Sequence, residues 1–342
     1  MVEQKAKTAV IILNWNGIQW LKQFIPTLIE NTNANEADLI VADNASTDDS
    51  VSYLKENHPE IQCILLDKNY GFAEGYNRAL EKITHSYSIL LNSDVEVTKD
   101  WLRPLINKLE SSDKIAACQP KIKDFYRKDY FEYAGASGGF IDYLGYPFCR
   151  GRMFDNLEQD QGQYDDEISI FWATGACLAI KTDVYKKVGG LDNLFFAHME
   201  EIDLCWRLKS RGYDIYAVPQ STIYHAGGGT LSKINPQKTF LNFRNNLYIL
   251  YKNLPSKFLI KILMIRFILD GVAGIKYLLS GQFSHTMAIL KAHFVFYTTV
   301  RKFKVKRQEN LKFSKTQNIP EIWQISMVKA FFLDKKTKFS DL

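Results

Sequence analysis

Polar side chains able to bind a cation follow one of the most apolar runs of the sequence. Residues 89–91 are Ile-Leu-Leu and predict a buried strand; Asn92, Ser93 and Asp94 come directly after it, and Glu96 lies slightly further on. Carboxylates at the carboxyl end of a central strand lie where open α/β sheets bind their ligands. They suit a hard divalent cation, which takes oxygen ligands and bridges to phosphate. Because an Asp here is also common as a turn residue or helix N-cap, the motif needs support from others.

Amide, carboxylate and glycine residues also follow the other strand-like runs early in the chain. Amides at such an end can contact a nucleotide, and a carboxylate after the second strand of a nucleotide-binding fold can accept hydrogen bonds from a base or ribose. A glycine lets the backbone approach a ligand, and the amides of a helix N-terminus attract phosphate. Simple turns and helix caps are the alternative explanation for each motif taken alone. The candidates are Asn14, Asn16, Asp43, Asn44, Asn69, Gly71 and Asn77.

An acidic cluster and a histidine occur later in the chain. Glu200, Glu201 and Asp203 open a predicted helix, where one of them can act as a general base. The helix dipole alone would also favour acidic residues there. Glu200 and Asp203 share a helix face, whereas Glu201 points elsewhere, so their roles should differ. His225 precedes three glycines and is a candidate ligand for a cation or phosphate, although a single His is usually structural.

An alternation of strands and helices must position these residues. Continuous apolar strands that alternate with helices indicate a mostly parallel sheet covered by helices on both faces. Residues 120–170 are rich in Tyr, Phe, Gly and Asp and lack periodicity, so we expect irregular strands and long loops there. We predict strands at 8–13, 39–42, 61–66, 88–91, 115–117, 170–180 and 213–218, and helices at 20–29, 50–56, 72–83, 101–109 and 200–211.

Composition indicates a globular protein. The chain has 342 residues, of which 46% are hydrophobic and 24% charged, so it can bury a large core in one or two domains. Its five cysteines are scattered and form no CxxC pair, which predicts reduced thiols in a cytosolic setting without a metal role. The apolar run near the N-terminus is too short for the core of a signal peptide.

The last third of the chain differs in charge from the rest. Residues 233–342 hold 20 Lys and Arg against 5 Asp and Glu, so an acidic body is followed by a basic tail. Such a tail suggests an anionic partner, either membrane phospholipid or nucleic acid. We expect one main α/β domain at 1–235 and a basic, apolar helical region at 236–342.

Two strongly apolar helices are predicted within this basic region, at 258–269 and 287–300. Charges such as Lys261 and Asp270 make the first a poor membrane-spanning segment. Five basic residues follow within 301–307. One interpretation is a peripheral surface on an anionic membrane leaflet, which the apolar helices favour over nucleic acid. The other is a helical bundle packed on the main domain with a solvated basic face.

Taken in order, these motifs resemble those of glycosyltransferase family 2, which has the nucleotide-sugar-dependent type A fold. In particular they resemble rhamnosyltransferase-like and galactofuranosyltransferase-like members, which build bacterial surface polysaccharides. The likeness covers roughly residues 7–255. The motifs are Val10–Gly17, Val41–Asp48, Asn69–Asn77, Leu91–Glu96, Trp172–Leu178, Gly189–Asp192, Phe195–Arg207 and Tyr224–His225.

The resemblance implies how the donor and a metal are bound. Asp43 would bind a uracil or thymine base and its ribose. Asn92-Ser93-Asp94 stands where the family has its Asp-x-Asp motif, so Asp94 is the expected carboxylate ligand of Mn²⁺ or Mg²⁺. His225 would complete the metal or diphosphate site. The expected donor-binding set is Asn14, Asn16, Asp43, Asn44, Asn69, Gly71, Asn77, Asn92 and Asp94.

The resemblance also implies the catalytic and acceptor residues. The family commonly has Glu-Asp in the acid cluster, with the Asp as base, and here the second position is Glu201. Glu200 stays the alternative base, and Asp203 completes the catalytic set. Trp172 and Gly175 would line the acceptor pocket. One base and no covalent nucleophile imply a single displacement with inversion at the anomeric carbon.

The expected function is therefore metal-assisted transfer of a sugar from a dTDP- or UDP-sugar to a glycan or lipid-linked hydroxyl. The expected location is the cytoplasm, on the inner face of the cell membrane. A nucleotidyltransferase is one alternative, but it should carry a Gly-rich, basic loop where this chain has Asn14–Gly17. A non-catalytic nucleotide-sugar-binding subunit is the other. The sequence predicts no nucleic-acid partner and leaves the oligomeric state open.

Overall fold

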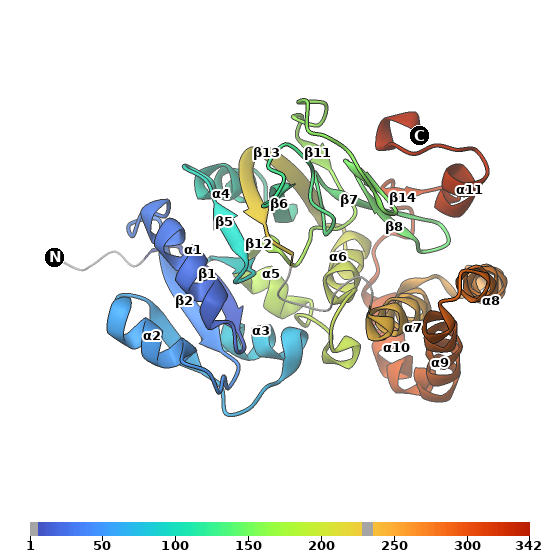
Figure 1. The fold of residues 1–342 in the computed structure, drawn as a ribbon, viewed down its shortest axis with the longest axis horizontal. Coiled ribbons are helices and arrows are strands. Elements are labelled where there is room, and N and C mark those ends of the chain that lie inside the picture. The colour runs from blue at the N-terminus through green and yellow to red at the C-terminus, as the bar shows by residue number, and fades with distance from the viewer. Residues whose placement is uncertain (1–5, 228–234) are drawn as a thin grey trace.

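Continuous apolar runs early in the chain form parallel strands joined by helices, as the sequence predicts (Figure 1). The structure, a computed structural model, describes residues 6–227 and 235–342. In this part of the sheet the order is β3-β2-β1-β4: β2 and β3 follow on one side of β1, and β4 lies on its other side. Open α/β sheets bind ligands at the point where the order of connection reverses in this way. These elements are β1 (Thr8–Asn14), α1 (Ile18–Glu30), β2 (Ala37–Asp43), α2 (Ser50–Asn57), β3 (Gln62–Leu65), α3 (Gly71–Glu81) and β4 (Tyr87–Leu91).

The central sheet continues beyond β4 with antiparallel pairs. β12 runs antiparallel to both β4 and β6, and β13 lies parallel to β6. The strand predicted at 213–218 is the first half of a longer one, because β13 continues past a register shift to His225. The elements are β5 (Val95–Val97), α4 (Leu102–Glu110), β6 (Ile115–Asp124), β11 (Ile168–Ser169), β12 (Cys177–Lys181), α5 (Thr182–Lys187), η1 (Asn193–Phe195), α6 (Glu200–Ser210) and β13 (Asp214–His225).

A second, smaller sheet occupies the region without sequence periodicity. Its strands are short and its last strand comes from the C-terminal segment, so the chain returns to the main body after its long helices. Phe140 and Phe148 pack there against Trp323 and Phe339. The elements are β7 (Gly139–Asp142), β8 (Pro147–Cys149), β9 (Arg152–Met153), β10 (Asn156–Leu157), β14 (Ile322–Trp323), α11 (Met327–Phe332) and η3 (Phe339–Asp341).

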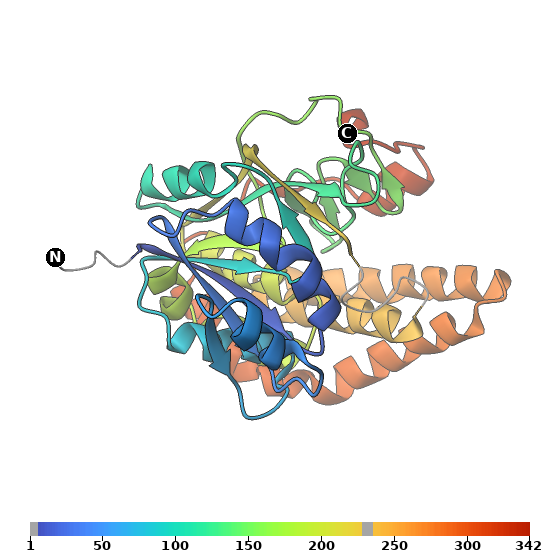
Figure 2. The same ribbon diagram turned by 60° about the vertical axis from the view of Figure 1, so that its left-hand side comes forward.

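Long helices project from one side of the central sheet (Figure 2). Asn235 caps the first of them by accepting a hydrogen bond from the Gln237 amide. Within the described residues, every helix falls short of the length or apolar character that crossing a membrane requires. We call these elements the helical extension: α7 (Pro236–Asn253), α8 (Ser256–Leu279), α9 (Phe283–Thr299), η2 (Val300–Phe303) and α10 (Lys304–Phe313).

The helical extension shares a core with the sheet. Leu247 and Leu250 of α7 belong to the same buried cluster as Ile11 of β1 and Leu204 of α6. The predicted α/β fold with a C-terminal helical extension is confirmed. The predicted domain boundary after residue 235 stays a prediction. All five cysteines are free thiols, and every one except Cys63 is buried.

Candidate active site

The polar ends of β1 and β2 meet at one edge of the sheet. Asn14 and Asp43 are register partners, and the Asn14 amide donates to Asp43 Oδ2 at 3.0 Å. Ser46 donates from its backbone N–H to Asp43 Oδ1 and from its hydroxyl to Oδ2. Asn16 is exposed and accepts a hydrogen bond from the Thr47 amide. An ionised carboxylate has about four lone-pair positions, so Asp43 retains one for a ligand.

Asn44 ties the end of β2 to the start of α3. Its side-chain amide donates to Asn69 Oδ1 and the Gly71 carbonyl, and its Oδ1 accepts from the Tyr70 amide. Gly71 has a φ of +74°, which favours glycine, and a Cβ there would approach the Phe196 carbonyl to 3.4 Å. Asn44 and Asn69 therefore shape the loop that presents the N-terminus of α3.

Asp94 and His225 lie together, although they are far apart in the sequence. His225 Nε2 is 3.1 Å from Asp94 Oδ1 and 3.5 Å from the side-chain nitrogen of Asn92. Asp94 and His225 are both buried. Glu96 turns away and pairs at 2.5 Å with Lys128 on the surface. The structure thus joins the end of β4 to the end of β13, and of Asp94 and Glu96 it is Asp94 that faces His225.

Glu132 is a site residue that the sequence does not reveal. It is buried, and its Oε1 lies 3.4 Å from His225 Nδ1. Burial lowers the pKa of His225, but Glu132 and Asp94 more than reverse this and raise the pKa to about 10. The imidazole is therefore held between two carboxylates, which favour its doubly protonated form. A metal ion bound to one ring nitrogen would take the place of the proton on that nitrogen. Glu132 lies in the aperiodic region, where no local signal marks it.

Asp94 and His225 are the residues at this edge suited to a metal. Within the part of the chain that the structure describes, no three His, Cys, Asp or Glu side chains gather as a ready metal cage. Mg²⁺ commonly binds through one or two protein ligands and completes its shell with water and substrate phosphate. A buried carboxylate beside a buried imidazole fits a cation that arrives with a diphosphate.

The acidic cluster begins directly after a strained backbone segment. Phe196, His198 and Met199 all have positive φ values, between 67° and 75°. Non-glycine residues rarely adopt this conformation, and such strain gathers at functional sites. It turns the chain sharply into α6 and sets the direction of Glu200 and Glu201.

The two glutamates differ in environment. Glu200 is buried, and its Oε2 finds no hydrogen-bond partner among the described residues. Burial, together with the nearby Glu201, raises the pKa of Glu200 well above its usual range. Glu201 is partly exposed, and burial raises its pKa to about 7. Glu201 can therefore change protonation state near neutral pH, whereas the environment of Glu200 favours its protonated form.

Asp203, Asn77 and Trp172, which the sequence places at the site, make ion pairs or hydrogen bonds that link elements of the fold. Asp203 is fully buried and pairs with Arg207 at 3.0 Å and Lys252 at 2.7 Å. The Asn77 amide is bonded to both backbone groups of Leu191. Trp172 is buried and donates to the Phe140 carbonyl at 2.9 Å, whereas Gly175 is accessible beside Phe72. The structure thus gives Asp203, Asn77 and Trp172 supporting positions.

Asn245 of α7 anchors the strained segment. This fully buried side chain donates to the carbonyls of Phe195, Ala197 and His198 at 3.2, 2.8 and 2.7 Å. Arg244 donates to Asn245 Oδ1 and to the Phe195 carbonyl. The helical extension therefore fixes the backbone that aims the glutamates. The sequence gives no sign of this, because the contact joins distant elements.

Replacing Asn245 by Ala is expected to destabilise the protein by about 1–3 kcal/mol, because buried carbonyls lose their donor. We also expect kcat to fall about tenfold or more, since a small misplacement of a catalytic group is costly. Urea unfolding and steady-state kinetics measure the two effects. Asn310→Ala is the control, because Asn310 is buried in α10 and bonds to Asn253. It should lose stability and keep kcat, and an equal loss of kcat in both variants would contradict the anchoring role.

Comparison with known proteins identifies the family. The family model described as glycosyl transferase family 2 matches residues 9–189. The chain belongs to this family. The protein is thus a glycosyltransferase. The match includes the ends of β1, β2 and β4 but stops before α6, so Glu200, Glu201 and His225 of this glycosyltransferase lie outside it.

Several characterised relatives resemble the glycosyltransferase in sequence. N-acetylglucosaminyl-diphospho-decaprenol L-rhamnosyltransferase of Mycobacterium tuberculosis is 23% identical over 234 residues, which cover 63% of this chain and 75% of the relative. Rhamnosyltransferase WbbL of Escherichia coli K12 is 25% identical over 215 residues, which cover 60% of this chain and 79% of the relative.

Solved structures confirm the type A fold of the glycosyltransferase. Mannosyltransferase PcManGT from Pyrobaculum calidifontis, in complex with GDP-Man and Mn²⁺, superposes with a TM-score of 0.52 at 14% identity. The superposition covers 91% of this chain and 87% of that one. GalNAc-T7 with UDP, GalNAc and Mn²⁺ gives a TM-score of 0.54 at 15% identity, over 73% of this chain and 48% of that one.

Proposed function

We propose that this glycosyltransferase moves a sugar from a dTDP- or UDP-sugar to a hydroxyl of a glycan or lipid-linked acceptor, with inversion, in surface polysaccharide synthesis. The observation that carries the proposal is the buried Asp94–His225 pair at the end of β4 and β13, combined with a titratable Glu201 at the start of α6. The rhamnosyltransferase relatives support a deoxyhexose or hexose donor and a lipid-linked acceptor. The location that goes with this proposal is the cytoplasmic face of the cell membrane.

Asp94 and His225 would hold Mn²⁺ or Mg²⁺ together with the donor diphosphate. When bound, the ion neutralises the charge that develops on the leaving nucleotide diphosphate. Asn92 is near enough to His225 to support the same group. Glu132 keeps the imidazole in place, as carboxylates commonly do for metal-binding histidines. The Mn²⁺ in the solved relatives of similar fold supports this choice of ion.

Glu201 is the proposed general base. A base works best when its pKa lies near the operating pH, and the pKa of Glu201 is about 7. Burial and the nearby Glu201 raise the pKa of Glu200 well above its usual range, which favours its protonated form and a supporting role as a hydrogen-bonding group. Glu201 takes the proton of the acceptor hydroxyl while that oxygen attacks the anomeric carbon and the nucleotide diphosphate leaves from the opposite side.

Asp43 and the loops beside it are the proposed donor site. The remaining lone pair of Asp43 suits an N–H of the base or a ribose hydroxyl. Asn14 orients Asp43, while Asn44 and Asn69 hold the loop at Gly71, where the amides of α3 face a phosphate. Gly175 leaves room for the acceptor beside Phe72.

A panel of nucleotide sugars tests the donor proposal. A ligand that binds only the folded state raises Tm, by an amount set by its concentration relative to Kd. We expect a dTDP- or UDP-sugar to raise Tm in the presence of Mn²⁺ or Mg²⁺, and to raise it less with EDTA. Release of nucleoside diphosphate should then require an acceptor. Binding without any transfer to polysaccharide or lipid-linked acceptors would instead identify a non-catalytic subunit.

A further inference from the structure

The outer surface of the hairpin formed by α8 and α9 is apolar. On α8, Ile260, Met264, Phe267, Ile268, Ile275 and Leu279 are between 59% and 83% exposed. Apart from the adjacent pair Phe267 and Ile268, they lie three, four or seven residues apart and therefore share one face. On α9, Phe283, Met287, Leu290, Phe294 and Tyr297 repeat the pattern. Exposed apolar residues normally occur singly, so a row of them on each of two packed helices indicates an interaction site.

One arginine and the aspartate of the same helices point inward, whereas their lysines are exposed. Arg266 and Asp270 are buried and pair at 3.1 Å, and His293 of α9 bonds to Asp270 at 3.0 Å. Arg266 also donates to the Leu144 carbonyl, and Tyr146 donates to Asp270. These contacts attach the hairpin to the second sheet. A helix in water normally has the opposite arrangement, whereas helices in contact with lipid turn their charges into the protein.

The exposed charges of this hairpin are all positive. In α8 and α9, which lie wholly within the described residues, they are Lys257, Lys261, Lys276 and Lys291. Arg301, Lys302 and Lys304 follow directly after α9 and are exposed as well. Lysines beside a lipid surface are attracted to anionic headgroups. Two copies of this face would bring like charges together, so the charge pattern favours phospholipid over self-association.

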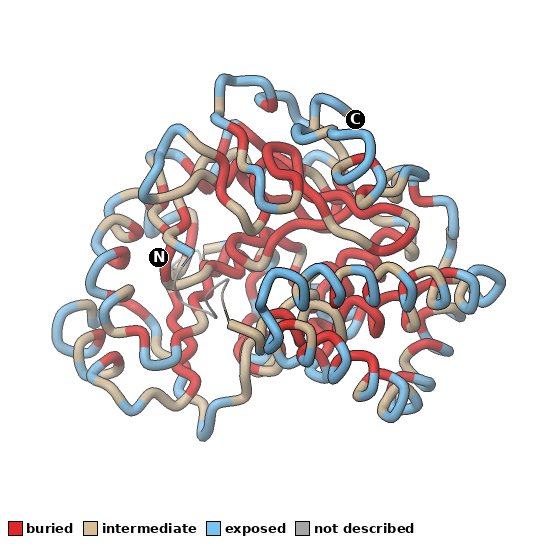
Figure 3. Tube along the Cα trace, turned by 45° about the vertical axis from the view of Figure 1, so that its right-hand side comes forward, coloured by how far each residue is buried: buried red, intermediate tan, exposed pale blue. Residues whose placement is uncertain are grey.

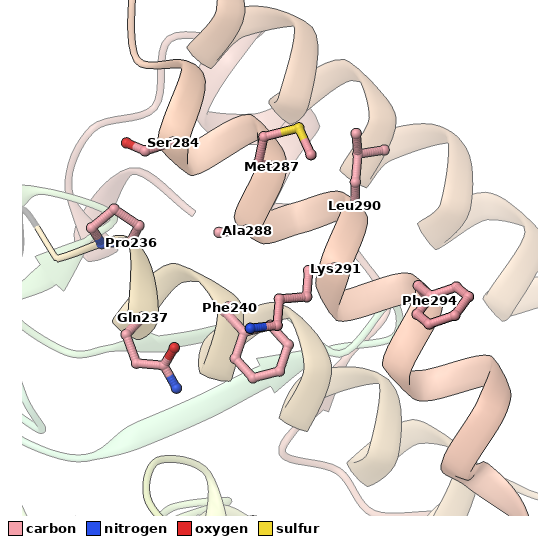
Figure 4. A pocket seen from close by; sticks show the side chains of 9 residues that line it. All are labelled: Pro236, Gln237, Phe240, Ser284, Met287, Ala288, Leu290, Lys291 and Phe294. Atoms are coloured by element: carbon pink, nitrogen blue, oxygen red, sulfur yellow. The ribbon is translucent and has the colours of Figure 1, made fainter.

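A groove extends the apolar surface toward α7. It has a volume of about 550 Å³ and lies between the start of α7 and α9 (Figure 4). Phe240, Leu290, Lys291 and Phe294 are among the residues that line it. Figure 3 shows the exposed outer turns of the projecting helices and their buried inner side. Leu290 and Phe294 belong both to the exposed apolar face of α9 and to this groove, so the groove adjoins that face.

We propose that the outer face of α8 and α9 inserts into the headgroup and acyl boundary of an anionic phospholipid bilayer without crossing it. The inference rests on the proposed function, because it adds a membrane-binding surface to the proposed use of a lipid-linked acceptor. On this proposal, the two interpretations of the basic, apolar helices apply to opposite sides of α8 and α9. The inner side packs on the main domain, and the outer side contacts lipid.

Vesicle sedimentation of the full-length protein tests the proposal. We expect binding to vesicles that contain phosphatidylglycerol and weak binding to pure phosphatidylcholine. Ile268→Glu and Phe294→Glu should each weaken binding at least about tenfold, because each removes apolar contact and adds a charge to the lipid interface. Replacing Lys261, Lys276 and Lys291 together by Gln should weaken binding to anionic vesicles about fivefold for each lysine. Leu65→Glu is the control, since Leu65 is an exposed leucine on β3, outside the helical extension, and this variant should bind normally.

A second measurement does not depend on whether the two Glu variants fold. Ile268→Cys in a Cys63→Ser background accepts an environment-sensitive fluorophore, whose emission should shift to the blue on adding anionic vesicles. An unchanged spectrum, or vesicle binding that Ile268→Glu does not affect, would overturn the proposal. So would a stable dimer in solution that Phe294→Glu converts to monomers. The assay contains no donor or acceptor, so its failure leaves the proposed transfer reaction testable on its own.

Discussion

Glu201→Gln is expected to lower kcat by about 10²–10⁴, the usual contribution of a general base, while donor binding stays near normal. Gln keeps the size and hydrogen-bonding reach of Glu but cannot accept the acceptor proton. Steady-state kinetics with a saturating acceptor give kcat, and nucleotide-sugar titration gives Kd. A variant that retains normal turnover would remove Glu201 from the mechanism.

The pH dependence of the wild-type enzyme gives an independent signature of the same group. The pKa of Glu201 is about 7, so the carboxylate is protonated and inactive below that pH. We expect kcat to fall tenfold per unit below pH 7 and to level off above it. Glu201→Gln should lose this dependence along with its activity.

Glu200→Gln is the matched control. Burial and Glu201 raise the pKa of Glu200 well above its usual range, which favours the neutral form that Gln imitates. We expect kcat within about tenfold of the wild type. If Glu200→Gln is inactive and Glu201→Gln is active, the base is Glu200.

The stability of Glu201→Gln should move in the direction opposite to its activity. A carboxyl whose folded pKa is raised loses stabilisation as pH rises through the folded pKa. At pH 8 the wild type has lost that stabilisation, whereas the Gln variant has no such group to ionise. Its Tm at pH 8 should therefore equal or exceed that of the wild type, which would exclude unfolding as the cause of inactivity.

Asp94→Asn is expected to remove most transfer activity, on the order of 10²-fold or more, because charge stabilisation worth several kcal/mol is lost. Calorimetric titration of Mn²⁺ in the presence of UDP measures the metal site without turnover. We expect that binding to weaken strongly, since Asn supplies one neutral oxygen where Asp supplies a charged one. Circular dichroism checks that the fold survives.

Glu96→Gln is the control for Asp94→Asn. Glu96 lies in β5 and pairs with Lys128 at the surface, so its loss should change Mn²⁺ binding little. Equal effects of both variants would contradict the assignment of Asp94 as the ligand.

The strand-end residues were predictable because parallel strands finish at a common edge. The pairing of Asn14 with Asp43 follows directly from the register of β1 and β2. His225 was visible as a motif, but its contact with Asp94 requires the long strand β13, whose second half the sequence pattern does not reveal. The order of polar motifs therefore carried more information than the periodicity of any one segment.

Contacts between distant, aperiodic segments were not predictable. Glu132 precedes His225 by almost a hundred residues and lies in a region without regular spacing. Asp203 was expected at the site, yet Arg207 lies four residues later on the same helix face, which is a local signal of an ion pair. The inward direction of Arg266 and Asp270 also depends on tertiary partners, because helix spacing alone does not say which face meets lipid.

The bond of Asn245 to the His198 carbonyl spans 47 residues and joins α7 to the backbone before Glu201. A fragment that ends before α7 would keep its glutamates and lose the clamp that orients them. A chimaera that combines residues 1–235 with the helices of another glycosyltransferase would face the same problem. The helices of this chain are thus not an interchangeable module, and the two parts of the protein must change together in evolution or in design.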